Sequence, residues 1–128
     1  MTITSKRPLS PHLQIYKPQL TSVLSISHRI TGVLLSFFSV MIPITLFFIY
    51  SGEQYFLEFK VIFNNIFIKI ILFSFIFFLF YHFANGIRHL FWDMGLGLSL
   101  KTSYYSGYLV IFFSCFATYF YIFLFKGF

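Results

Sequence analysis

Three long, strongly apolar runs decide what this chain can fold into. The first, residues 30–50, has 21 residues without a charged side chain, and about 20 apolar residues suffice for a helix to cross a bilayer. The second, residues 63–88, begins less sharply because two asparagines and Lys69 lie near its start. The third, residues 102–125, is closed by Lys126. Because backbone polar groups find no partner in hydrocarbon, each run is predicted to form a membrane-spanning helix.

The overall composition agrees with a membrane protein. Of the 128 residues, 59% are hydrophobic and only 9% are charged, whereas a soluble domain carries about 25% charged residues. The net charge of +6 comes from nine basic residues, most of them at the edges of the apolar runs. This distribution is typical of topology anchors and not of nucleic-acid binding. We therefore predict an all-α integral membrane protein with three transmembrane helices in one bundle.

The predicted boundaries follow from these runs and from the helix breakers between them. Three prolines at positions 8, 11 and 18 discourage helix in the amino-terminal arm, and Pro43 is expected to kink the first span. Gly95 and Gly97 are expected to break the helix after the second span. The predicted segments are an inner-face arm with the start of the first helix at 1–29, transmembrane helices at 30–50, 63–88 and 102–125, an outer loop at 51–62, an inner loop at 89–101 and a tail at 126–128.

The basic residues also predict an orientation. Six lie in or beside the arm and the inner loop, and three lie in or beside the outer loop and the tail: Lys6, Arg7, Lys17, Arg29, Arg88 and Lys101, against Lys60, Lys69 and Lys126. This excess predicts that the amino terminus is inside. The polar clusters at 25–29 and 82–93 are then expected in the same leaflet, where they would suit a cofactor with an apolar body and anionic edge groups.

The cluster at 82–93 contains the strongest candidate ligand. His82 and Asn85 are costly in an apolar setting, and in a helix His82, Gly86 and His89 share one face. A glycine near a histidine lets a flat group approach the backbone, so His82 is a candidate axial ligand of a haem iron. The alternative is a histidine that is hydrogen-bonded to a neighbouring helix. A second axial ligand would come from His28, from His89 or from another polypeptide.

The cluster at 25–29 points to a second kind of ligand. Ser25 and Arg29 lie one turn apart on one helix face, and a hydroxyl with a guanidinium can hydrogen-bond a carbonyl oxygen such as that of a quinone. Arg29 and Arg88 also fit the alternative of inside-positive helix-end anchors. His28 is placed to pair with a propionate, and Asp93 is expected to form a structural ion pair with one of the two arginines.

Several function classes are excluded by what the chain lacks. Its one cysteine, Cys115, allows no intrachain disulfide and suits a packing role. No zinc spacing, nucleophile triad or phosphate-binding glycine loop is present, so a self-contained hydrolase or kinase is not expected. The first thirty residues contain no apolar core typical of a secretory signal.

Three motifs together resemble a known family. They are R-P-L-S-P-H-L-Q-I-Y at 7–16, S-I-S-H-R-I-T-G at 25–32 and H-F-A-N-G-I-R-H-L-F-W-D at 82–93. In this combination they resemble the large cytochrome b anchor subunit of succinate dehydrogenase. The resemblance extends from the arm to the third span, although the first loop and the third span match only in length and hydrophobicity.

The resemblance implies a place in respiratory complex II, an electron-transport complex that also serves the tricarboxylic acid cycle. In that family, three helices pair with a second small anchor subunit, and the two anchors hold one haem b between them and dock an iron–sulfur and a flavoprotein subunit. His82 would be the haem axial ligand, with the other ligand from the partner anchor. Ser25 and Arg29 would line the ubiquinone pocket, and His28 would lie near the haem propionates, with Arg88 and His89 as weaker candidates there.

The expected function is therefore that of a membrane anchor in succinate:ubiquinone oxidoreductase. Succinate oxidation would take place on other subunits, so no dehydrogenase activity is expected from this chain alone. The expected location is the mitochondrial inner membrane, with the bacterial inner membrane as the alternative. Rival hypotheses are a haem b anchor of fumarate reductase or another quinone-linked dehydrogenase, and a cofactor-free assembly protein with three spans.

Overall fold

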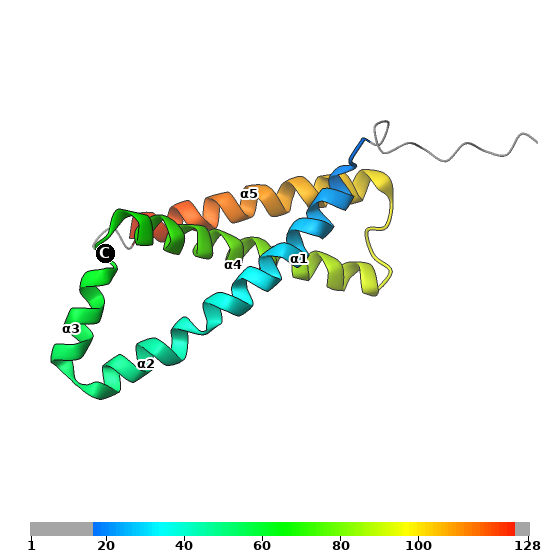
Figure 1. The fold of residues 1–128 in the computed structure, drawn as a ribbon. Helices are drawn as coiled ribbons and strands as arrows, with labels where there is room; N and C mark the ends of the chain where they lie inside the picture. Colours follow the sequence, from blue (N-terminus) through cyan, green and yellow to red (C-terminus); the bar gives the residue numbers. More distant parts are fainter. Residues whose placement is uncertain (1–16, 125–128) are drawn as a thin grey trace, which may run out of the picture.

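The structure is a computed structural model that describes residues 17–124. Within that range it contains five helices and no strand (Figure 1): α1 (Leu20–Ser39), α2 (Met41–Ser51), α3 (Glu53–Ile62), α4 (Ile66–Asp93) and α5 (Leu100–Leu124). Three helical segments are long and apolar enough to cross a membrane: Leu20–Ser51, Ile66–Asp93 and Leu100–Leu124. The prediction of an all-α membrane protein with three transmembrane helices is therefore confirmed. The motif at 7–16 and the tail at 126–128 lie outside the described residues.

Two helices extend beyond the predicted spans. α1 begins at Leu20, well before residue 30, because Leu20 and Leu24 face the other helices and give this polar stretch an apolar side. α4 continues past residue 88 to Asp93. Gly95 and Gly97 then have φ angles of 76° and 75°, a conformation that glycine adopts without steric cost. The predicted helix break at these two glycines is thus observed, although the connection is shorter than the predicted inner loop.

The segment predicted as an outer loop is mostly helical. Gly52, with a φ of 115°, ends α2 and allows the chain to turn directly into α3. Phe48 of α2 then stacks on Phe59 of α3 with ring centroids 4.4 Å apart, a contact that stabilises the corner. The polar residues of this segment indicated exposure to water, but exposure does not exclude helix.

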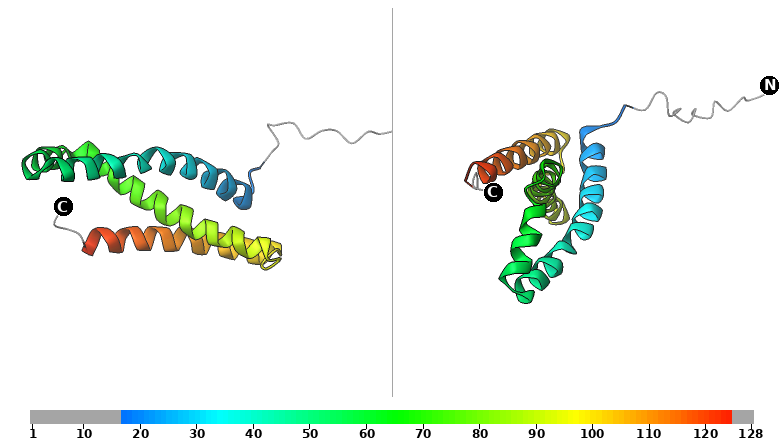
Figure 2. Two further views of the ribbon diagram at one scale, coloured as in Figure 1. Left: turned by 90° about the horizontal axis from the view of Figure 1, so that it is seen from below. Right: turned by 60° about the vertical axis from the view of Figure 1, so that its left-hand side comes forward.

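The first span is interrupted where its proline predicts. Pro43 has no amide hydrogen to donate to the carbonyl of Ser39, and the helix is broken at Val40, between α1 and α2. Beyond this break, α2 and α3 lie away from the paired α4 and α5, and α3 bridges back to the start of α4 (Figures 1 and 2).

The packed part of the molecule is centred on α4, which contacts α1 on one side and α5 on the other (Figure 2). Leu24, Tyr81 and Val110, one from each of these helices, form its buried core. The buried residues of α5 are all small: Ser103, Gly107, Val110, Ser114 and Thr118. Small residues let helix backbones approach closely within a membrane, so α5 can pack tightly against the end of α1 that carries the 25–29 cluster.

Candidate functional site

The two polar clusters meet where α1 packs on α4. The rings of His28 and His82 stack with centroids 3.9 Å apart and an interplanar angle of 9°. The ring of His89 lies 5.2 Å from that of His28, tilted by 43°. The clusters at 25–29 and 82–93, which were expected in the same leaflet, are therefore in contact, and three of the four histidines of the chain lie at one interface.

Hydrogen bonds to α1 fix the orientation of the His82 ring. Its Nδ1 lies 3.1 Å from the carbonyl oxygen of His28 and 3.2 Å from Oγ1 of Thr31. A carbonyl can only accept, and the Thr31 hydroxyl already donates within its own helix, to the carbonyls of Ser27 and His28 at 2.9 Å each. We infer that Nδ1 carries the proton, which leaves Nε2 with a free lone pair. Nε2 has no hydrogen bond within residues 17–124.

Two glycines permit the close approach of the histidines. A Cβ added at Gly32 would lie 3.0 Å from Cε1 of His82, and one added at Gly86 would lie 3.7 Å from Cε1 of His28. Gly86, expected to leave room beside His82, therefore faces the histidine of the other helix. Gly32 and Thr31 were not singled out from the sequence, although both belong to the motif at 25–32. Their role depends on how α1 faces α4, which the sequence alone does not give.

His28 has a polar atom that the described residues do not satisfy. Its Nδ1 is buried and has no hydrogen-bond partner within residues 17–124. Buried polar atoms almost always have a partner, so this nitrogen suits a group supplied from elsewhere, such as an anionic acceptor. The residues present therefore fit a group that binds beside the histidine stack.

Ser25 and Arg29 lie on another face of α1. They line a shallow depression of about 320 Å³, together with neighbours on the same helix: Thr21, Ser22 and Ile26. Ser25 is half-buried and Arg29 is exposed. Neither side chain makes a hydrogen bond or ion pair in the part of the chain that the structure describes. A hydroxyl and a guanidinium one turn apart are thus both free to bind a ligand.

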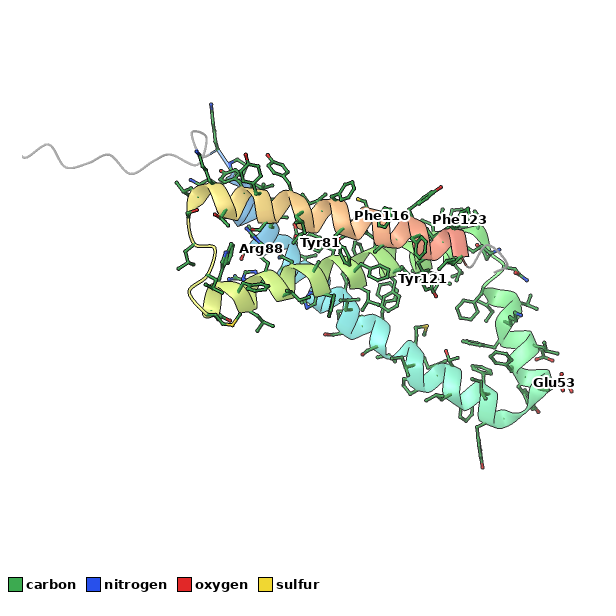
Figure 3. The ribbon with its side chains drawn as sticks, turned by 180° about the vertical axis from the view of Figure 1, so that it is seen from behind. Glu53, Tyr81, Arg88, Phe116, Tyr121 and Phe123 are labelled. Carbon is green, nitrogen blue, oxygen red and sulfur yellow. The ribbon has the colours of Figure 1, made fainter. Side chains whose placement is uncertain are left out.

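Arg88 is turned toward α5, between the helices, as Figure 3 shows. Only 4% of its surface is exposed. Its Nε donates to Oγ of Ser106 at 3.0 Å, Nη1 donates to Oδ1 of Asn85 at 3.2 Å, and Nη2 donates to the carbonyl and hydroxyl oxygens of Ser103 at 3.0 and 3.2 Å. The guanidinium also lies 4.0 Å from the centroid of the Trp92 ring. These contacts differ from those of an exposed helix-end anchor.

Both arginines fit helix-end anchors by sequence, but the structure places them differently, with Arg29 exposed and Arg88 buried. The partners of Arg88 are neutral groups, and neither arginine forms the expected ion pair with Asp93 within the described residues. The sequence missed the hydroxyls of α5 as partners of Arg88, because the third span offered no motif. Among residues 17–124, no three His, Cys, Asp or Glu side chains are grouped to hold a metal ion, so His82 is considered as a single ligand.

Comparison with known proteins gives the family. A family model described as "Succinate dehydrogenase/Fumarate reductase transmembrane subunit" matches residues 3–121. The succinate dehydrogenase cytochrome b556 subunit of Rickettsia bellii is 49% identical over 109 residues, which cover 85% of each chain. The corresponding b560 subunit of Marchantia polymorpha is 42% identical over 119 residues, covering 86% of this chain and 84% of the relative. That of Reclinomonas americana is 40% identical over 110 residues, covering 82% and 76%.

These relatives agree with the membrane character of the fold. With three helices that can span a bilayer and relatives from both a bacterium and a plant, both a bacterial and a mitochondrial inner membrane fit the chain. The region matched by the family model includes α1 to α4 and all of α5 except its last three residues. The chain belongs to the family of transmembrane subunits of succinate dehydrogenase and fumarate reductase.

Proposed function

We propose that this chain is the membrane-anchoring cytochrome b subunit of succinate:ubiquinone oxidoreductase. In this proposal His82 would hold the iron of haem b, and Ser25 and Arg29 would form part of the ubiquinone site. The observation that carries the proposal is the hydrogen bonding of His82 Nδ1 to α1, which leaves Nε2 available to a metal. Family membership and the cytochrome b names of the relatives support it.

The residues around His82 suit haem ligation. Histidine ligands of metals normally donate their second ring nitrogen to a carbonyl or another acceptor, which fixes the tautomer and raises the basicity of the ligating nitrogen. The His28 carbonyl and the Thr31 hydroxyl supply those acceptors here. The haem would supply one-electron chemistry. A second ligand of the haem iron would come from the partner anchor subunit.

The imidazoles beside His82 are proposed to bind the edge of the cofactor. His28 Nδ1, buried without a partner in the described residues, would donate to a propionate. His89 adjoins His28 and would add a second polar contact. Arg88 is the weakest of the three residues, because its donors already bind Asn85, Ser103 and Ser106. Its role near the propionates stays a prediction.

Ser25 and Arg29 are proposed to bind the quinone head group. The Ser25 hydroxyl and the Arg29 guanidinium would donate to one carbonyl oxygen of the ring. As the quinone is reduced, negative charge develops on that oxygen, and a fixed cation beside it lowers the energy of the reduced form. The amino terminus is proposed to be inside, so that both residues lie at the inner face, where the iron–sulfur subunit would dock.

The large exposed apolar surface suits partner subunits and lipid. α2 has no buried residue, and side chains such as Phe47 remain more than half exposed. In a membrane this surface is covered either by lipid or by other helices. The proposed partners are a second small anchor subunit, an iron–sulfur subunit and a flavoprotein subunit.

A difference spectrum of the assembled complex tests the haem proposal. The variant His82→Ala should lose the b-type band of the reduced-minus-oxidised spectrum, while succinate reduction of a water-soluble acceptor shows that the complex is still assembled. The variant His89→Ala, on the same helix, should retain the band. A band of unchanged intensity and position in His82→Ala would exclude ligation by His82 and leave a haem with other ligands, and a parent complex without any b-type band would leave a cofactor-free anchor.

A further inference from the structure

Three helices are joined through one residue of α1, Leu24. Its carbonyl oxygen accepts hydrogen bonds from the Tyr81 hydroxyl at 3.0 Å and from Asn85 Nδ2 at 3.2 Å, both from α4. Leu24 and Tyr81 are 3% and 5% exposed, and Asn85 is fully buried. Two cross-helix hydrogen bonds to one carbonyl of a transmembrane helix fix how that helix is rotated against its neighbour.

The side chain of Leu24 adds a constraint from α5. A Cβ added at Gly107 would lie 2.7 Å from Cδ1 of Leu24 and 3.4 Å from Cδ2 of Leu20. These leucines therefore fill the space that the glycine leaves. Leu24 is thus held by α4 through its carbonyl and by α5 through its side chain, and α1 cannot rotate without breaking both contacts.

Arg88 determines which way the Asn85 amide points. A guanidinium can only donate hydrogen bonds, so its contact at 3.2 Å requires the oxygen of the amide to face Arg88. The nitrogen must then face Leu24. Arg88 is itself fixed on the other side by hydrogen bonds to Ser103 and Ser106 of α5. The result is a continuous path from α5 through Arg88 and Asn85 to the backbone of α1.

We propose that Tyr81, Asn85 and Arg88 are positioning residues that set the rotation of α1 and thereby the direction in which Ser25 and Arg29 face. This inference rests on the proposed quinone role of Ser25 and Arg29. Ser25 directly follows Leu24 in the chain, and neighbouring helix residues point about 100° apart. The face that carries Ser25 and Arg29 therefore turns with Leu24.

The path also accounts for an arginine inside an apolar interface. A buried cation is costly in a membrane unless its donors are satisfied, and a cation that served only to anchor the helix would be satisfied by water and lipid head groups. The Arg88 guanidinium instead donates to Asn85, Ser103 and Ser106. Asn85 in turn donates to the Leu24 carbonyl of α1.

The test removes the hydrogen bond from Asn85 to α1 while keeping a hydrogen-bond acceptor for Arg88. In Asn85→Asp the carboxylate can still accept from Arg88 but can no longer donate to Leu24. A second variant, Gly107→Ala, disturbs Leu24 from α5 without adding a charge. The matched control is Ser114→Ala, because Ser114 is a buried serine of α5 whose hydroxyl, among residues 17–124, bonds only within its own helix, to the Val110 carbonyl.

The first readout is the kinetics of the assembled complex with a short-chain ubiquinone. Both test variants should raise the apparent KM for the quinone about three- to tenfold, with succinate reduction of a water-soluble acceptor unchanged. The control should match the parent protein. An unchanged KM in both test variants would overturn the proposal.

The second readout does not depend on the quinone. In a Cys115→Ser background, a reporter Ser25→Cys is labelled with a maleimide in the intact complex. Asn85→Asp and Gly107→Ala should each change the labelling rate about threefold or more, and Ser114→Ala should not; equal rates in all variants would contradict a rotation of α1. If Arg29→Ala leaves quinone kinetics unchanged while labelling still responds, the quinone role fails and the constraint on α1 stands.

Discussion

The contact between Gly32 and His82 allows a prediction with a built-in control. In Gly32→Ala the new Cβ would lie 3.0 Å from His82 Cε1, whereas ordinary contacts begin at 3.4 Å, so the ring must retreat by about 0.4 Å. The distance from Nδ1 to the His28 carbonyl, 3.1 Å at present, would then approach about 3.5 Å, at the limit of a hydrogen bond. The ring has little room to adjust otherwise, because it also stacks on His28.

The expected magnitude follows from those losses. Overpacking typically costs about 1–3 kcal/mol, and the weakened hydrogen bond is one of the distortions that this range includes, so we take the total as roughly 1–3 kcal/mol. If His82 ligates the haem, this corresponds to roughly 5- to 150-fold weaker retention. The assay is the fraction of b-type absorbance that remains with the purified complex after a timed incubation at raised temperature, normalised to succinate reduction of a water-soluble acceptor.

The control variant is Gly86→Ala on the facing helix. Its new Cβ would lie 3.7 Å from His28 Cε1, an ordinary van der Waals contact, so haem retention should stay close to that of the parent protein. The two variants add the same methyl group to the same interface and differ only in the space that receives it. Equal haem retention in Gly32→Ala and Gly86→Ala would refute the argument that His82 is held against Gly32.

Three further predictions concern single side chains. Arg29→Ala should lower quinone reduction far more than reduction of a water-soluble acceptor, and an equal loss in both assays would make Arg29 structural. Ser25→Ala should raise the apparent KM for quinone by the equivalent of one hydrogen bond, about 0.5–1.5 kcal/mol; an unchanged KM would remove Ser25 from the site. Arg88→Met should reduce the amount of assembled complex that survives detergent extraction, because Asn85 and Ser103 lose a hydrogen-bond partner, at a cost of about 1–3 kcal/mol per unsatisfied group. If the variant complex is recovered in the same amount as the parent complex, the contacts of Arg88 to α5 contribute little to stability.

The three membrane-spanning helices could be predicted because a segment that crosses a bilayer must be composed almost entirely of apolar residues. A run of about 20 uncharged residues has few alternatives to a membrane helix, and all three spans were expected for that reason. The start of α1 was expected somewhere within residues 1–29, but its position at Leu20 was not predicted, because the apolar side formed by Leu20 and Leu24 becomes evident only from packing against α4 and α5. The α3 helix was missed for a related reason, since its polar residues indicate exposure and not backbone conformation.

The site was predictable in its parts and not in its contacts. Polar residues in apolar runs identified His82 and Asn85, and the positive-inside rule brought His28 near them, because both arguments use chemistry that the sequence contains. The stack of His28 on His82 and the closeness of Gly32 depend on the rotation of one helix against another. Likewise, Arg88 was expected among charged groups because its serine partners on α5 carry no signal of their own.

A single turn of α1 supplies residues to two proposed sites, so a rotation of this helix would change both sites at once. His28 and Arg29 are consecutive, so their side chains point about 100° apart, one toward His82 on α4 and the other into the depression that Ser25 shares. A rotation that moved Arg29 toward a different ligand position would also move the His28 carbonyl away from His82 Nδ1, where it lies at 3.1 Å. Changes at the quinone face should therefore alter the haem spectrum when they rotate α1, and leave it unchanged when they only remove a donor, as Ser25→Ala does.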